Sequence, residues 1–313
     1  MQKTLTKENN FVSAVLYLHN DMEYAEAMLN AVYSQLSENF KKFEIICVDD
    51  ASTDKTCEVI KHLTVNIQDT IVSIVHMGYF QGVEASMRAG VSYAIGDFVF
   101  EFDSAVLDFN PTLIMDVYRT SLRGFDMVSA APTNNRRASS IWFYKLFNRY
   151  FPGGADLKTE RFRIISRRLI NRIMDVNSWI PYRKAAYIGS GLAYTALPYQ
   201  VAQAYKTKHE NEIESYRKGI AVDTLMLYTD IAYKFSIVMS LIMALLTLAS
   251  LVYTVVVFIA GNPISGWTTT MLMLSGGLFG VFCILAMLVK YMALLVHLQN
   301  KRRGYVVSGT EKV

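Results

Sequence analysis

The feature that most constrains the fold of this chain is a run of 55 residues, positions 235–289, without any Asp, Glu, Lys or Arg. A turn-forming segment with two glycines and a proline, residues 261–266, divides the run near its middle. Each half is longer than the roughly 20 apolar residues that cross a bilayer as a helix. The sequence therefore predicts a hairpin of two transmembrane helices over residues 235–298, with a buried helix pair of a soluble protein as the alternative.

Basic residues on either side of the predicted hairpin indicate its orientation. Lys234 precedes the first span, three basic residues at 301–303 follow the second, and the loop between them carries no charge. Because positive charge accumulates on the cytoplasmic side, we expect an inner (plasma) membrane protein whose residues 1–230 and tail, 299–313, face the cytoplasm. The formal net charge of +4 is modest, and without basic clusters typical of nucleic-acid binding we expect no nucleic-acid partner.

Ahead of the hairpin, short apolar segments alternate with segments whose apolar residues recur at helical spacing. This alternation predicts βαβ units in an α/β domain with a mostly parallel sheet, of the type that binds nucleotides. We place the domain at residues 1–214. The predicted strands are 11–18, 44–48, 70–76, 97–102 and 126–131, and the predicted helices are 22–36, one ending at about 63, 82–94 and 112–121.

Carboxylates follow two of the predicted strands at the point where each strand ends. Asp49 and Asp50 come after one strand, and Asp103, followed by Asp108, comes after another. Ligands of open α/β sheets bind outside the carboxyl ends of the strands. A carboxylate pair there can accept hydrogen bonds from a base and a ribose, and a further carboxylate can hold a divalent cation on a diphosphate. Neither a GxGxxG nor a GxxxxGK[ST] motif is present, so the sequence supports neither a dinucleotide cofactor nor a phosphate-binding P-loop.

Three further segments combine basic and apolar residues. Residues 136–151 are compatible with a helix at a membrane surface or with a core helix whose arginines are solvated. Residues 161–168 are too basic for a plain buried strand, and we expect their arginines to receive phosphate. Residues 215–234 predict an interfacial amphipathic helix that leads into the membrane.

The cysteines and histidines do not predict a zinc site. The chain has three cysteines without CxxC spacing, as expected of reduced thiols, and its five histidines are far apart in the sequence. We therefore interpret both residue types as structural or solvated.

Taken together, these motifs resemble the family-two glycosyltransferases, and among them the branch that loads sugars onto polyprenyl phosphate. Residues 48–54, VDDASTD, are nearly the VDDGSTD of that family, and residues 13–21 lie where it has a strand and a P-x-Y-N-E turn. Residues 82–90 follow its G-K-x-A-A-x-x-A-G helix, residues 162–168 follow its F-R-L-L-S-R-R, and the hairpin completes the plan. Dolichol-phosphate mannose synthases and undecaprenyl-phosphate glycosyltransferases belong to this branch.

The resemblance implies a GT-A-type domain that transfers a sugar, with inversion, from a nucleotide sugar to an undecaprenyl-type phosphate at the cytoplasmic membrane face. It implies that Mg²⁺ or Mn²⁺ binds at Asp103, and that the product enters an envelope-glycan pathway. The partners it implies are the donor, the lipid phosphate, the membrane and a second copy of the chain. The residues it assigns are Asn20, Asp49, Asp50 and Asp103 for the donor, Asp103 and Asp108 for catalysis, and Arg163, Ser215 and Arg217 for the acceptor phosphate.

The chain also departs from the family pattern. The D-x-D motif is degenerate, because Asp103 is followed by Ser104 and Ala105. Glu101 lies two residues before Asp103 on the same face of the strand. Glu101 and Asp103 are therefore an alternative pair of carboxylates in place of the D-x-D pair. Such losses leave a second hypothesis, a relative without catalysis that binds a lipid-linked sugar or acts as a scaffold for other membrane enzymes.

Overall fold

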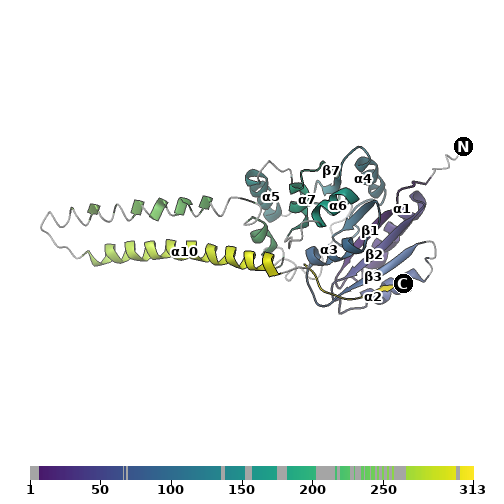
Figure 1. Cartoon of the computed structure of the whole chain (residues 1–313), viewed down its shortest axis with the longest axis horizontal. Helices are drawn as coiled ribbons and strands as arrows, with labels where there is room; N and C mark the ends of the chain where they lie inside the picture. Colours follow the sequence, from purple (N-terminus) through teal and green to yellow (C-terminus); the bar gives the residue numbers. More distant parts are fainter. Residues whose placement is uncertain are drawn as a thin grey trace.

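The computed structural model describes residues 7–65, 67, 70–134, 138–151, 157–174, 182–201, 216, 219–225, 229, 266–300 and 304–313, with single positions between 234 and 256. In these residues strands and helices alternate along the chain (Figure 1), which confirms the predicted α/β class. The helices are α1 (Ala25–Asn39), α2 (Thr56–Thr64), α3 (Val83–Tyr93), α4 (Leu113–Ser121), α5 (Ala138–Tyr150), α6 (Arg167–Met174), α7 (Arg183–Gly189) and α10 (Trp267–Asn300).

One eight-stranded sheet forms the centre of the domain, with strand order β7-β5-β6-β4-β1-β2-β3-β8. The neighbours β3, β2, β1 and β4 are parallel, as are β5 and β7, whereas β6 runs antiparallel to both its neighbours and β8 runs antiparallel to β3. The sheet is therefore mixed, and the predicted parallel part is its middle. The strands are β1 (Val12–Leu18), β2 (Phe43–Asp49), β3 (Ile71–Met77), β4 (Phe98–Phe102), β5 (Met127–Pro132), β6 (Phe162–Ser166), β7 (Tyr194–Tyr199) and β8 (Val307–Lys312).

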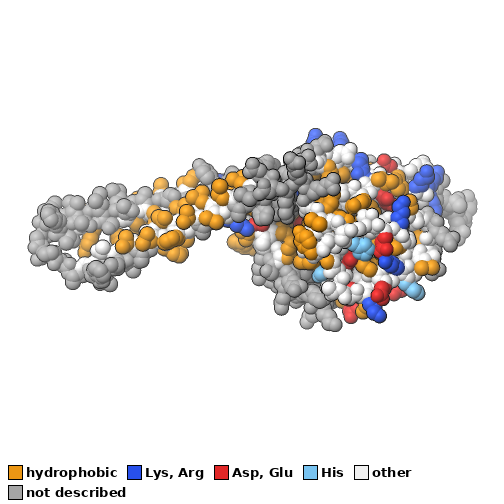
Figure 2. All heavy atoms as spheres, turned by 60° about the horizontal axis from the view of Figure 1, so that its bottom comes forward, with side chains coloured by type: hydrophobic (Ala, Val, Ile, Leu, Met, Phe, Trp, Pro, Cys, Tyr) orange, Lys and Arg blue, Asp and Glu red, His pale blue; other side chains and the backbone are white. Residues whose placement is uncertain are grey.

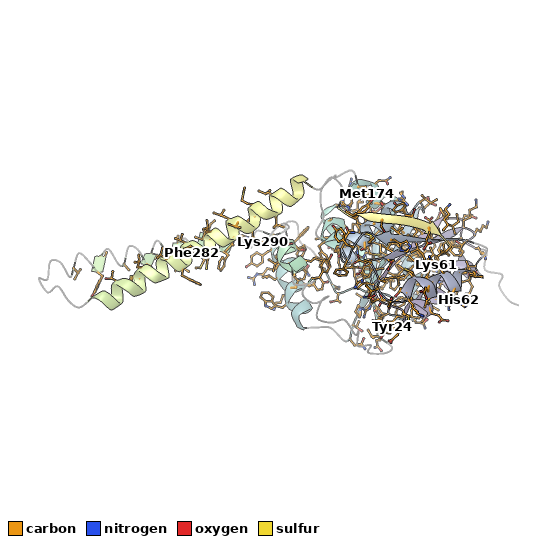
Figure 3. All side chains as sticks on the ribbon, turned by 90° about the horizontal axis from the view of Figure 1, so that it is seen from below. Tyr24, Lys61, His62, Met174, Phe282 and Lys290 are labelled. Atoms are coloured by element: carbon orange, nitrogen blue, oxygen red, sulfur yellow. The ribbon has the colours of Figure 1, made fainter. Side chains whose placement is uncertain are left out.

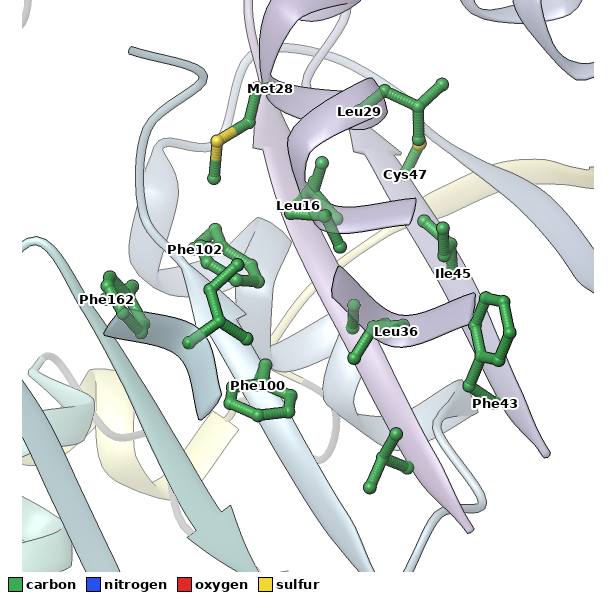
Figure 4. Close-up of a cluster of buried hydrophobic side chains, with 14 of the residues drawn as sticks. Leu16, Met28, Leu29, Leu36, Phe43, Ile45, Cys47, Phe100, Phe102 and Phe162 are labelled. Atoms are coloured by element: carbon green, nitrogen blue, oxygen red, sulfur yellow. The ribbon is translucent and has the colours of Figure 1, made fainter. Parts of the chain in front are cut away.

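Helices cover both faces of the sheet, which explains why the central strands are apolar on both sides. Residues of α1, α2 and α4 pack on one face in a cluster with Leu16, Ile45 and Phe102 (Figure 4). Residues of α3, α5, α6 and α7 pack on the other face with Val15 and Val48. The domain thus has three layers, with the sheet between two layers of helices.

The basic segment at 161–168 is a correction to the sequence analysis. Its residues 162–166 form β6, a buried strand between β5 and β4, and Arg163 is only 2% exposed. The register sets Arg163 directly opposite Glu101 of β4. A buried arginine is tolerated because carboxylates of neighbouring elements neutralise it. The prediction that this segment is too basic for a buried strand was wrong, because the carboxylates that neutralise Arg163 come from other segments of the chain.

Helix α3 packs closely on β1 and β2 at Gly90, and this contact gives a first testable prediction. A Cβ atom at Gly90 would lie 2.4 Å from Val15 Cγ1 and 2.5 Å from Val48 Cγ2. We expect Gly90→Ala to lower the free energy of unfolding by about 1–3 kcal/mol, because overpacking in a core costs that much. Gly309→Ala is the matched control, since its Cβ would meet nothing within 4 Å. Equal denaturant midpoints for the two variants would contradict the prediction.

Helix α10 projects from the domain and runs from its far end back toward the sheet (Figure 1), and the chain then adds β8 beside β3. Apolar side chains cover the projecting part (Figure 2), and many are largely exposed, among them Phe279, Phe282 and Val289. Among the residues that the structure describes, no helix combines the length and the apolar character needed to cross a membrane. The transmembrane hairpin, the interfacial helix at 215–234 and the boundaries of the domains stay predictions.

Candidate active site

The strand register brings the sequence-predicted carboxylates to one edge of the sheet. Leu18 of β1 pairs with Asp49 of β2, and Leu16 of β1 pairs with Phe102 of β4. Asp49, Asp50 and Asp103 therefore all lie at the carboxyl ends of neighbouring parallel strands. This edge is where open α/β sheets bind their ligands.

Asp50 holds the loop between β3 and α3. Its Oδ1 accepts the Gln81 backbone N–H at 2.8 Å, and its Oδ2 accepts the Gly82 N–H at 2.8 Å and the Tyr17 hydroxyl at 3.0 Å. Burial and the charge of Asp50 raise the pKa of Tyr17 well above its usual value, so the hydroxyl stays protonated and donates. Asp50 is fully buried, so its contacts fix the loop between β3 and α3, and its role toward a donor stays a prediction.

Asn20 organises the neighbouring loop after β2. Its backbone adopts a positive φ of 54°, a conformation that asparagine tolerates better than most residues. Its side-chain Oδ1 accepts the backbone N–H groups of Thr53 at 2.7 Å and of Asp54 at 3.3 Å. Asn20 thus fixes the loop that carries the predicted donor-binding aspartates, and its role toward a donor stays a prediction.

Asp103 belongs to a group of seven charged side chains, called here the ion cluster. Arg183 Nη2 contacts Asp103 Oδ1 at 2.7 Å and Arg183 Nη1 contacts Glu101 Oε1 at 2.5 Å. Arg183 also donates from Nε to Glu84 Oε2 at 2.9 Å. Arg163 binds the other Asp103 oxygen and Glu101. The ion cluster comprises the carboxylates Glu84, Glu101, Asp103 and Glu160 and the cations Arg163, Arg183 and Lys184.

The electrostatics of the ion cluster keep Asp103 charged. Burial raises the pKa of Asp103, but the charges of Arg163 and Arg183 outweigh burial, so the pKa lies below its usual value. Burial also raises the pKa of Glu84, and there it outweighs the charge of Arg183. The side chain of Asp103 is 25% exposed, against 9% or less for Glu84, Glu101 and Glu160. Asp103 is therefore the carboxylate of the cluster that opens toward a ligand.

Asp108, the second predicted catalytic carboxylate, has other partners. It is 1% exposed, its Oδ2 accepts from Arg161 Nε at 2.8 Å, and its Oδ1 accepts from the Tyr199 hydroxyl at 3.1 Å. These contacts tie the segment after β4 to β6 and β7. The arrangement favours a structural role for Asp108, and its part in catalysis stays a prediction.

The predicted acceptor-phosphate residues are only partly described. The Arg163 guanidinium faces Glu101, Asp103 and Glu160 in the interior, so it reaches a ligand only at the Asp103 side. Ser215 and Arg217 lie outside the described residues. Tyr216, between them, places its ring against Gly82, where an added Cβ would be 2.1 Å from its Cζ. The Tyr216 ring thus packs against the loop that Asp50 holds.

Sequence reasoning missed Arg183 and Glu160, and it used Glu84 only as part of a motif. Arg183 begins α7, about 80 positions after Asp103, and no local pattern connects the two. The available signal was Glu101, a carboxylate in the middle of an otherwise apolar strand. A buried carboxylate requires a cationic partner, and Arg183 is that partner together with Arg163. Glu101 and Asp103 thus contact the same two guanidinium groups, and their rival pairing at one cation stays a prediction.

The residues around Asp103 fit a divalent cation of the Mg²⁺ or Mn²⁺ type. Each Asp103 oxygen accepts from one guanidinium, and a carboxylate oxygen has two lone pairs, so acceptor capacity toward the open side remains. Magnesium commonly takes one or two protein carboxylates and completes its shell with water and substrate phosphates. Asp103 would supply one such carboxylate ligand, and water and a bound diphosphate would supply the others.

The fold and the strand edge together define a class, an α/β domain that binds a ligand at the carboxyl ends of parallel strands with acidic side chains. The chain belongs to glycosyl transferase family 2, because the family model matches residues 13–174, more than half of the sequence. Among solved structures, glucosyl-3-phosphoglycerate synthase from Mycobacterium tuberculosis, in complex with Mn²⁺, UDP and its product, superposes with a TM-score of 0.54 at 17% identity. The match covers 71% of this chain and 81% of that one, and shows a GT-A-like fold.

Curated relatives agree with the family assignment. An uncharacterised glycosyltransferase of Synechocystis is 28% identical over 193 residues, 59% of each chain. The undecaprenyl-phosphate 4-deoxy-4-formamido-L-arabinose transferase of Proteus mirabilis is 29% identical over 44% of this chain and 40% of its own length. The bactoprenol glucosyl transferase of Shigella phage SfV is 26% identical over 52% of this chain and 54% of its own. The chain therefore spans about 40–59% of the length of these relatives.

Proposed function

We propose that the protein transfers a sugar from a nucleotide sugar to a polyprenyl phosphate at the cytoplasmic face of a membrane, with inversion at the sugar. The observation that supports this most is the convergence of Asp49, Asp50 and Asp103 on one strand edge. The names of the Proteus and phage relatives, which act on undecaprenyl phosphate and bactoprenol, support the lipid acceptor. The proposal names neither the sugar nor the nucleotide of the donor.

In this proposal the donor lies along the strand edge. Its nucleoside contacts the loops that Asn20 and Asp50 organise, and its diphosphate reaches Asp103. A phosphate oxygen of the lipid attacks the anomeric carbon, the bond from that carbon to the diphosphate oxygen breaks, and the electron pair leaves with the nucleoside diphosphate. The acceptor phosphate is already an anion near neutral pH, so no strong general base is required.

The leaving diphosphate sets the main electrostatic demand of this reaction. A divalent cation at Asp103 would neutralise charge on the leaving diphosphate. Arg163 and Arg183 keep the Asp103 carboxylate charged and oriented, since each guanidinium binds one of its oxygens. Stabilising charge as it develops is commonly the largest single contribution to catalysis. The ion cluster therefore serves as the rigid base of the diphosphate subsite.

The second part of the proposal is a membrane anchor in residues 235–298. Support comes from the charge-free run in the sequence and from the largely exposed apolar side chains on either side of its turn, such as Leu241 at 63% and Phe279 at 66%. Water-exposed apolar surface of this extent is typical of membrane or protein contacts. Lys290 of α10, labelled in Figure 3, pairs with Asp223 at 2.6 Å, which ties α10 to the predicted interfacial segment.

A transfer assay tests the proposed function. The full chain in mild detergent is incubated with undecaprenyl phosphate, Mn²⁺ and a panel of radiolabelled nucleotide sugars, and lipid-soluble label is counted. We expect saturable transfer from one donor, lost on chelation of the metal and restored by Mn²⁺, with no label in the lipid phase when the acceptor is omitted. A folded protein that transfers label from none of the donors would contradict the proposal.

The degenerate D-x-D motif favours one alternative function. With a single carboxylate at the diphosphate subsite, and both of its oxygens bound by arginine, a relative that binds a lipid-linked sugar without catalysis, or acts as a scaffold, is the second candidate. The same protein separates the two functions. Binding of a polyprenyl-linked sugar without transfer from any donor supports the alternative.

A further inference from the structure

Asp49, Cys57 and His76 converge beside the strand edge, although they come from three different elements. Asp49 ends β2, Cys57 lies in the first turn of α2, and His76 lies near the end of β3. One potential ligand atom from each, an oxygen, a sulfur and a nitrogen, lie within 4.8 Å of one another. The sequence alone had indicated no zinc site, because these three positions have no recognisable spacing.

Each ring nitrogen of His76 faces a carboxylate oxygen. Its Nε2 lies 2.9 Å from Glu311 Oε1, and its Nδ1 lies 3.2 Å from Asp49 Oδ2. Histidines that bind metals commonly donate their second N–H to a carboxylate, which fixes the tautomer. When Glu311 accepts from Nε2–H of a neutral ring, the Nδ1 lone pair faces the Asp49 carboxylate. That arrangement requires a cation or a proton between the two atoms.

The neighbouring side chains keep these groups in position. Asp49 Oδ1 accepts the Ser52 backbone N–H at 3.0 Å, which leaves Oδ2 directed at His76. Glu311 Oε1 also binds Lys61 Nζ of α2 at 2.7 Å, and Lys61 is labelled in Figure 3. Asp49 is buried, whereas His76 and Cys57 are partly exposed. An ion can therefore enter from solvent, and a water molecule can occupy a fourth position.

We propose that Asp49, Cys57 and His76 form a binding site for Zn²⁺, with Glu311 as the carboxylate that orients His76. A mixed set of one thiolate, one imidazole and one carboxylate suits Zn²⁺, whereas Mg²⁺ and Mn²⁺ prefer oxygen ligands. The bound ion links β2, α2 and β3, and through Glu311 it also holds the C-terminal strand β8 against β3. The site lies next to Asp50, so it stiffens the edge at which the donor is proposed to bind.

Cobalt is the probe that tests this site without any measurement of sugar transfer. The full chain, stripped of metal, is titrated with Co²⁺ and followed by absorption spectroscopy. We expect one equivalent to produce a near-ultraviolet thiolate-to-cobalt band and the visible bands of tetrahedral Co²⁺, and Zn²⁺ to displace it stoichiometrically. If a protein without transferase activity gives this result, the zinc site is supported and only the proposed function is contradicted.

Variants assign the signal to these residues. We expect Cys57→Ser to abolish the thiolate band and His76→Gln to abolish tight binding, whereas Cys283→Ser and His62→Gln, the matched controls, keep both. Glu311→Gln should weaken binding by about 10–100-fold, as is typical for a carboxylate that orients a metal-bound histidine. The proposal is overturned if Co²⁺ gives no thiolate band, if the band survives in Cys57→Ser, or if Mn²⁺ competes as well as Zn²⁺. Any of these results would indicate that His76 and Asp49 share only a proton.

Discussion

Arg183→Met should destabilise the protein by about 3–5 kcal/mol, because removing one partner of a buried ion pair leaves uncompensated charge in the interior. Arg183 is 2% exposed and contacts Glu84, Glu101 and Asp103. The ion cluster holds four carboxylates against three cations, and the substitution leaves four against two. Denaturant unfolding of the full chain in detergent, followed by far-ultraviolet circular dichroism, measures the loss.

Arg119→Met is the matched control for this substitution. Arg119 also contacts an aspartate, Asp116, but the two side chains are 54% and 58% exposed, and exposed ion pairs contribute little to stability. We expect its unfolding midpoint to stay close to that of the parent protein. Arg183→Lys should fall between the two, since a lysine keeps the charge but lacks the planar guanidinium that contacts three carboxylates. If Arg183→Met unfolds at the same midpoint as Arg119→Met, the ion cluster contributes no net stability.

Asp103→Asn should lower the rate of sugar transfer by at least about 10²-fold, the usual effect of removing one group that stabilises developing charge. The substitution removes the carboxylate at the proposed diphosphate subsite and keeps its shape. It also removes one negative charge from the ion cluster, which then holds three carboxylates against three cations. We therefore expect the variant to fold, so that the loss belongs to the reaction.

The assay for Asp103→Asn compares kcat and KM with those of Asp116→Asn. Asp116 lies on α4 with a side chain that is 58% exposed, and its replacement should leave both constants unchanged. A lower kcat in Asp103→Asn, together with a weaker response to Mn²⁺, supports a cation at Asp103. Full activity in Asp103→Asn would place the diphosphate elsewhere on the strand edge and contradict the site proposed here.

Local patterns in the sequence were sufficient for the central sheet. The strands β1 to β5 and the helices α1 to α4 were predicted within a few residues, because both faces of the sheet are covered and the strands are correspondingly apolar. The strands β6, β7 and β8 were not predicted. In β6 the charge of Arg163 obscured the apolar pattern, and β8 joins the sheet only because α10 brings the chain back beside β3.

The candidate site divides in the same way. Asp50 and Asp103 were placed correctly on one edge, because the carboxyl ends of parallel strands necessarily meet there. The partners of Asp103 were not predictable, since Arg163 and Arg183 lie 60 and 80 positions away from it. Nor did any spacing reveal that Cys57 and His76 lie beside Asp49.

The sequence by itself determined the layered α/β architecture, the family of the chain and the common edge on which the aspartates Asp49, Asp50 and Asp103 lie. Each of these follows from local periodicity and from the way in which parallel strands end. Only the tertiary structure decided which charges neutralise one another around Asp103 and which potential metal ligands meet at Asp49. Both depend on distances between side chains of distant segments, and packing alone sets those distances.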